Sequence, residues 1–153
     1  MLPLITRAEL LSQVEAGTVV VVDTMPVAYY EKEHLPEARN IPGFPYDQAA
    51  GFTDRLAPSV LPDKNAAIVV YCANTPCRNS EFVGRRLVEL GYKNVRKYRE
   101  GIEDWVAGGL PTGARVRGPA AIEYVIRRGG RSEERRVGKE CRPLCRSRWS
   151  PYH

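Results

Sequence analysis

The chain has 153 residues, of which 43% are hydrophobic and 27% charged, a composition typical of one globular domain. No apolar run approaches the roughly 20 residues that a membrane-spanning helix needs, and the N-terminus does not resemble a signal peptide, so we expect a cytoplasmic protein. The net charge of +5 does not indicate nucleic-acid binding, because residues 131–153 hold seven of the 23 basic side chains and three of the 18 acidic ones, leaving +1 for the rest.

Helix-like and strand-like segments alternate through the first half of the chain. Capping-box spacing predicts a helix over 7–16, and a β-branched run predicts a buried strand over 18–23. A proline then opens a short helix over 26–32. A short strand is expected over 38–41, and a helix over 46–56. This order is typical of an α/β domain.

The second half continues the alternation. A buried strand is predicted over 66–71, an amphipathic helix over 80–90, a short strand over 94–98 and a short helix over 101–107. A further helix is expected over 120–127. Because two strands are apolar throughout and the crossovers are long enough for helices, the sheet is expected to be mostly parallel.

Cys72 stands directly after the strand over 66–71, where parallel sheets bind their ligands. The loop that follows leads into a helix, so its backbone N–H groups and the helix N-terminus favour an anion. Asn79 or Ser80 is expected to cap that helix, and Arg78 adds a positive charge. We therefore expect a thiolate at Cys72, since lowering a cysteine pKa from about 8.5 to ~6.5 raises the thiolate fraction at pH 7 from about 3% to about three-quarters.

Several spaced motifs over about residues 4–113 resemble the rhodanese-like family. They are Val22-Asp23 with Tyr30, His34-Leu35-Pro36 and Ala38-Arg39-Asn40-Ile41-Pro42; Val70-Tyr71-Cys72 with Leu90-Gly91-Tyr92 and Asn94-Val95; and Gly101-Ile102, Trp105 and Gly109-Leu110-Pro111. The resemblance implies an α/β fold with a central, mostly parallel five-stranded sheet flanked by helices on both faces. It also implies that Cys72 is the catalytic cysteine.

Some positions depart from the family pattern. Met25 stands where many members carry arginine, Glu33 and Glu100 replace common glycines, and the loop carries Pro76 and Cys77 in place of its frequent glycine. These residues resemble a subgroup with a C-x4-C-x-N-S loop. The departures concern the surroundings of the loop, so they bear on the substrate and not on the fold.

The resemblance implies a sulfurtransferase that moves a sulfane sulfur from an anionic donor such as thiosulfate, through a Cys72 persulfide, to cyanide or a protein thiol. No cofactor or metal is expected, and neither nucleic acid nor membrane is an expected partner; the oligomeric state is not indicated. The residues expected to bind the substrate and the persulfide are those of the loop, namely Ala73, Asn74, Thr75, Pro76, Cys77 and Arg78.

The neighbouring residues have alternative roles. Cys77 either resolves an oxidised Cys72 as a disulfide or packs within the loop, and Arg78 either binds the anionic donor or faces solvent. His34 is expected to play a structural role, and Asp23 to order the loop after its strand.

Two other functions remain open. Cys72 and Arg78 have the C-x5-R spacing of a rhodanese-fold phosphatase or arsenate reductase, in which arginine binds a tetrahedral oxyanion. Alternatively, a Cys72–Cys77 disulfide would suit a redox-sensing or interaction module.

We divide the chain into a domain over 1–113, an extension over 114–130 that includes the predicted helix, and a tail over 131–153. The tail strings RSEERRVGKECR and SRWSPYH resemble a translated sequencing adapter, so we expect a disordered, non-native segment. A zinc site that uses Cys141 and Cys145 is not favoured, because the tail lacks the hydrophobic periodicity of an ordered framework.

Overall fold

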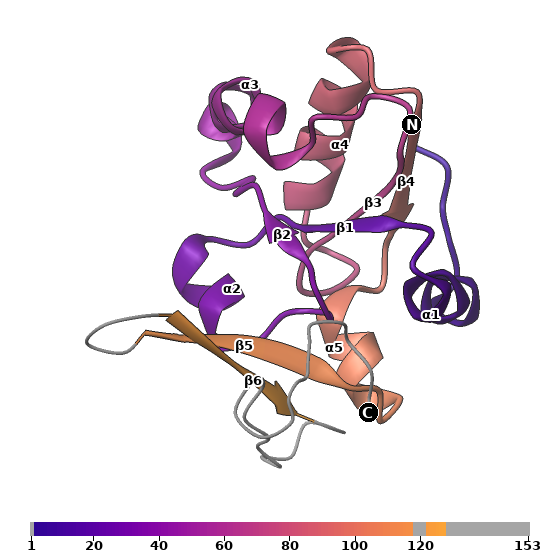
Figure 1. Ribbon diagram of the computed structural model, residues 1–153. Helices are drawn as coiled ribbons and strands as arrows, with labels where there is room; N and C mark the ends of the chain where they lie inside the picture. Colours follow the sequence, from indigo (N-terminus) through magenta and orange to yellow (C-terminus); the bar gives the residue numbers. More distant parts are fainter. Residues whose placement is uncertain (1, 118–121, 128–153) are drawn as a thin grey trace.

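The computed structural model describes residues 2–117 and 122–127, and its centre is a parallel β-sheet (Figure 1). The sheet has the strand order β2-β1-β3-β4. At its edge, Leu4 forms a parallel bridge with Lys97 of β4, which adds a fifth pairing one residue long. The predicted α/β fold with a parallel sheet is confirmed. The four strands are β1 (Val20–Asp23), β2 (Arg39–Asn40), β3 (Ala67–Tyr71) and β4 (Asn94–Tyr98).

Helices cover both faces of this sheet. They are α1 (Arg7–Ala16), α2 (Val27–Lys32), α3 (Ala49–Val60), α4 (Asn79–Glu89) and α5 (Gly101–Ala107), with a 3-10 turn η1 (Tyr46–Gln48) before α3. Side chains alternate along a strand, so Ile68 and Val70 of β3 pack beneath α3 and α4. Val69 and Tyr71 pack on the opposite face, with α1, α2 and α5. This alternation explains why the strands are apolar throughout.

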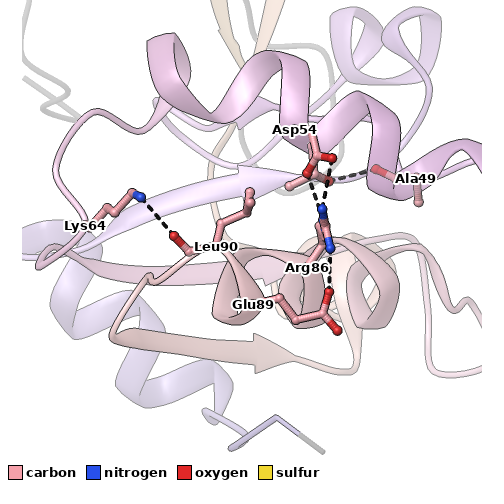
Figure 2. A network of polar contacts seen from close by, with 7 residues as sticks. Ala49, Asp54, Lys64, Arg86, Glu89 and Leu90 are labelled. Atoms are coloured by element: carbon pink, nitrogen blue, oxygen red, sulfur yellow. Dashed lines mark hydrogen bonds and ion pairs between the residues drawn. The ribbon is translucent and has the colours of Figure 1, made fainter.

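A polar network on the surface joins α3 to α4 (Figure 2). Arg86 of α4 donates two hydrogen bonds to the Asp54 carboxylate, at 2.7 and 3.0 Å, and a third to Glu89 at 2.8 Å. Lys64 donates to the Leu90 carbonyl at 2.8 Å. Exposed ion pairs contribute little to stability, so this network adds little to the free energy of folding.

The C-terminal part of the described chain is an antiparallel hairpin of β5 (Thr112–Arg117) and β6 (Ile122–Arg127). The helix predicted over 120–127 is therefore wrong. Ile122, Tyr124 and Val125 all favour strands, and β5 supplies backbone partners that sequence periodicity does not reveal. Two 2.8 Å hydrogen bonds between the backbones of His34 and Gly113 tie the hairpin to the domain.

Residues 118–121 and 128–153 lie outside the described residues, and with them the predicted tail and its two cysteines. Among the residues that are described, no helix is both long and apolar enough to cross a membrane.

Candidate active site

Cys72 follows β3 directly and is 1% exposed at the carboxyl edge of the sheet. The loop from Cys72 to Arg78 crosses this edge and enters α4. The connections after β1 and β4 lie beside it, since the Thr24 N–H donates to the Tyr71 carbonyl at 2.9 Å and α5 contacts the loop backbone. Three segments distant in sequence therefore enclose the cysteine.

Helix α5 sets the orientation of the loop backbone. Its Ile102 and Glu103 N–H groups donate to the carbonyls of Cys72 and Ala73, both at 3.0 Å. Gly101 makes this approach possible, because it has φ +77° and a Cβ there would lie 2.5 Å from the Cys72 carbonyl oxygen. These two hydrogen bonds hold the first two residues of the loop against α5.

The start of α4 completes the surroundings of Cys72. Ser80 is fully buried, and its hydroxyl lies 3.6 Å from the Cys72 sulfur. Asn79 donates from its side chain to the Thr24 carbonyl at 2.9 Å. The expectation that Asn79 or Ser80 caps α4 is wrong, because Arg78 occupies the cap position and makes no side-chain cap hydrogen bond. Tertiary contacts use these two side chains instead.

The two loop cysteines form one interacting pair. The Cys72 thiol donates to the Cys77 carbonyl oxygen, with 3.4 Å between sulfur and oxygen, so the two residues are in contact. That contact and burial raise the pKa of Cys72. The pKa of Cys77 is lowered, first by the hydrogen bond from Cys72 and then by the backbone N–H groups of Asn79 and Ala73 and the charge of Lys97. The expectation of a lowered pKa at Cys72 is therefore wrong, because the pKa that the loop lowers is that of Cys77.

Lys97 is a site residue that the sequence did not reveal. It is only 9% exposed and forms an ion pair with Glu81 of α4, with 3.4 Å between nitrogen and oxygen. In the sequence it is a lysine in a short strand, with no motif around it. Only the packing of β4 against α4 brings its charge near Cys77.

Asp23 and His34 lie in separate hydrogen-bond networks. Asp23 is 1% exposed and accepts hydrogen bonds from the Tyr71 hydroxyl at 2.7 Å and the Met25 N–H at 2.8 Å. Burial raises the pKa of Asp23 to about 7 despite these bonds. His34 is stacked on Tyr30 and its Nδ1 lies 2.7 Å from the Tyr30 carbonyl oxygen.

The remaining loop residues face outward. Thr75 and Pro76 are exposed at the tip, and Asn74 donates to Glu103 of α5 at 3.2 Å. The Arg78 side chain is exposed, with its guanidinium 5.8 Å from the centre of the Phe82 ring on α4. Arg78 therefore lies along α4 and does not form the inward clamp that a C-x5-R oxyanion enzyme needs.

The site brings two thiols together with groups that can stabilise a negative charge on sulfur. A buried thiol, a half-buried thiol, inward N–H groups, a hydroxyl and an ammonium lie within one loop and its supports. Over residues 2–117 and 122–127, no group of three or more His, Cys, Asp or Glu side chains is arranged to hold a metal ion.

Comparison with known proteins identifies the relatives of the chain. The family model of the rhodanese-like domain matches residues 6–108. The HTH-type transcriptional regulator Rv0324 of Mycobacterium tuberculosis is 37% identical over 107 residues, which cover 70% of this chain and 43% of that protein. The chain thus spans less than half the length of this relative.

Solved structures agree in fold. The rhodanese-like domain of the Alr3790 protein from Anabaena has a TM-score of 0.60 at 26% identity, covering 79% of this chain and 87% of that one. A thiosulfate sulfurtransferase from Pseudomonas aeruginosa also has a TM-score of 0.60, at 18% identity, over 72% of this chain and 19% of that one. At that identity the second likeness concerns the fold alone.

Proposed function

The chain belongs to the rhodanese-like domain family, and from this premise we propose that it is a sulfurtransferase in which Cys72 carries a sulfane sulfur as a persulfide. The observation that carries the proposal is the position of Cys72 between the end of β3 and the start of α4, with Cys77 and the Ser80 hydroxyl in contact with its sulfur. A persulfide anion requires such a set of donors, because its outer sulfur bears the charge.

The first step loads the sulfur. The Cys77 thiolate accepts the proton of Cys72, and the resulting Cys72 thiolate attacks the outer sulfur of an anionic donor. With thiosulfate, a Cys72–sulfur bond forms, the sulfur–sulfur bond of the donor breaks, and sulfite leaves with the bonding electron pair. The contact between the Cys72 thiol and Cys77 brings the two residues close enough for this transfer.

The second step passes the outer sulfur to a nucleophile such as cyanide or a protein thiol. Attack on the outer sulfur returns Cys72 as a thiolate, so electrons and protons balance without a cofactor. Loop residues Ala73 to Arg78 bind the donor and the persulfide through their backbone in this scheme. Free thiols suit a reducing compartment, in agreement with a cytoplasmic protein.

A redox module is the second candidate function. It is favoured by the contact between Cys72 and Cys77, which would form a disulfide on mild oxidation without any sulfur donor. The outward direction of Arg78 weighs against the phosphatase or arsenate reductase.

The test is intact mass spectrometry of the full chain after thiosulfate and again after cyanide. We expect a gain of one sulfur, about 32 Da, when Cys77 is replaced by serine, and removal of this sulfur by cyanide. The Cys72→Ser variant should gain nothing, because it lacks the nucleophile. Sulfur loading that survives Cys72→Ser would refute the assignment, and a disulfide as the only product, with no sulfite released, would favour the redox module.

A further inference from the structure

We propose that Cys77 is a second catalytic residue, which attacks the persulfide on Cys72, forms a Cys72–Cys77 disulfide and releases hydrosulfide. The inference rests on the proposed function, because it requires a persulfide on Cys72. The domain would then reduce its own persulfide to hydrosulfide. An external dithiol would complete the cycle by reducing the Cys72–Cys77 disulfide.

The two sulfur-bearing residues are already in contact. The Cys72 thiol donates to the carbonyl oxygen of Cys77, with 3.4 Å between sulfur and oxygen. A turn closed by the Cys77 N–H and the Asn74 carbonyl, at 3.2 Å, folds the loop back toward its first residue. Disulfides need Cα atoms only about 4.4–6.8 Å apart, a range that a short folded loop can reach.

The surroundings of Cys77 are those of a reactive thiolate. An inert, packed cysteine lies among apolar groups, which disfavour its charged form. Cys77 instead meets the backbone N–H groups of Ala73 and Asn79 and the positive charge of Lys97. It is half-buried, whereas Cys72 is 1% exposed, so Cys77 also has the better access to a reductant.

The step balances without any further reagent. After loading, the pair holds a Cys72 persulfide anion and a Cys77 thiol, and proton transfer gives the protonated persulfide and the Cys77 thiolate. This thiolate attacks the inner sulfur, the Cys72–Cys77 bond forms, and the bond to the outer sulfur breaks. Hydrosulfide leaves with the electron pair and the proton. Cys77 is thereby both the base of the loading step and the nucleophile of the release step.

Lys97 acts as a positioning residue in this scheme. Its ammonium is held by Glu81 at 3.4 Å and favours the charged form of Cys77. Lys97→Met should slow the release of hydrosulfide, and also that of sulfite, because the Cys77 thiolate serves both steps; the final amount of each product per chain should not change. Lys93→Met is the matched control, because Lys93 is exposed and precedes the opposite end of β4.

The experiment uses the full chain in a Cys141→Ser/Cys145→Ser background, so that Cys72 and Cys77 are the remaining two of its four cysteines. The reduced protein, freed of external thiol, is mixed with excess thiosulfate. Sulfite, hydrosulfide and intact mass are measured to the end of the reaction. We expect one sulfite and one hydrosulfide per chain and a mass loss of about 2 Da, for the two hydrogens lost in a disulfide.

The Cys77→Ser variant separates loading from release. It should release one sulfite, no hydrosulfide, and gain about 32 Da at Cys72. Adding dithiothreitol should then restore hydrosulfide release, because an external thiol replaces the missing one. The amount of product is the readout and not the rate, since the variant also lacks the group that accepts the Cys72 proton.

The possible results distinguish a failure of the proposed sulfurtransferase function from a failure of the proposed role of Cys77. Absence of sulfite from the protein with both cysteines would overturn the proposed function itself. Sulfite without hydrosulfide, or a sulfur that moves to Cys77 and stays there, would overturn this inference and leave the sulfurtransferase intact. Equal hydrosulfide release from Cys77→Ser would also overturn it.

Discussion

Substitution of Gly101 by alanine tests whether α5 sets the active loop. The new Cβ would lie 2.5 Å from the Cys72 carbonyl oxygen and from the Ala73 carbonyl carbon. Both are backbone atoms, so no flexible side chain can move aside. The residue also has φ +77°, which alanine adopts only at a cost.

The magnitude follows from two contributions. The left-handed backbone costs about 1 kcal/mol for a residue with a Cβ. To relieve the overlap, α5 must withdraw from the loop and lose the hydrogen bonds from Ile102 and Glu103, worth about 1 kcal/mol each. We expect Gly101→Ala to lower the free energy of unfolding by about 3 kcal/mol, a loss that a typical domain survives.

Gly109→Ala is the matched control. Gly109 has φ +76°, and nothing lies within 4 Å of the position that an added methyl group would take, so only the backbone cost of about 1 kcal/mol applies. Urea denaturation followed by circular dichroism measures both variants, and sulfite release from thiosulfate measures the loop. In the absence of urea, Gly101→Ala should remain folded but lose most of its sulfite release. Gly109→Ala should keep its sulfite release. Equal destabilisation of the two variants, or full sulfite release by Gly101→Ala, would refute the role assigned to α5.

Three further substitutions probe the core and the supports of the site. Trp105 is fully buried and donates to the Pro111 carbonyl at 2.8 Å, so Trp105→Ala should lower the free energy of unfolding in urea by about 3–5 kcal/mol; a loss below about 1 kcal/mol would contradict its place in the core. The pKa of Asp23 is raised from 3.8 to about 7, so its protonated form stabilises the fold at low pH. That stability, about 4 kcal/mol, is lost as the pH rises from about 4 through 7. Asp23→Asn should remove most of this pH dependence of the free energy of unfolding, measured by urea denaturation at several pH values. An unchanged pH dependence would count against the raised pKa of Asp23. Asn79→Ala removes the 2.9 Å hydrogen bond to the Thr24 carbonyl, which keeps its second bond from the Gly43 N–H, so the variant should lose about 1 kcal/mol of stability together with part of the sulfite release. Unchanged stability and release would show that α4 needs no such anchor.

Local patterns predicted most of the domain. The helix over 7–16 coincides with α1, and the strand over 94–98 with β4, because caps, glycine stops and β-branched runs act within a few residues. The helix expected over 120–127 failed where the deciding interaction was not local. There β6 forms because β5 pairs with it.

In the site, too, some features follow from the local sequence and others depend on tertiary contacts. By itself the sequence determined that a cysteine ends a buried parallel strand and precedes a helix, since hydrophobic runs and turn residues specify that order. It did not determine which thiol carries the charge. That depends on Lys97, Ala73 and Asn79 converging on Cys77, while burial and the hydrogen bond to Cys77 keep the proton on Cys72.

Tertiary structure decided these points because electrostatic and steric effects act through space. Lys97 lies 20 residues from Cys77 in the sequence, and Gly101 lies 29 residues from Cys72, yet each bears on the loop through the packing of β4 and α5. Spacing along the chain records which residues a strand or helix contains. Only the folded arrangement of those elements brings a charge to one sulfur and a backbone carbonyl to one glycine.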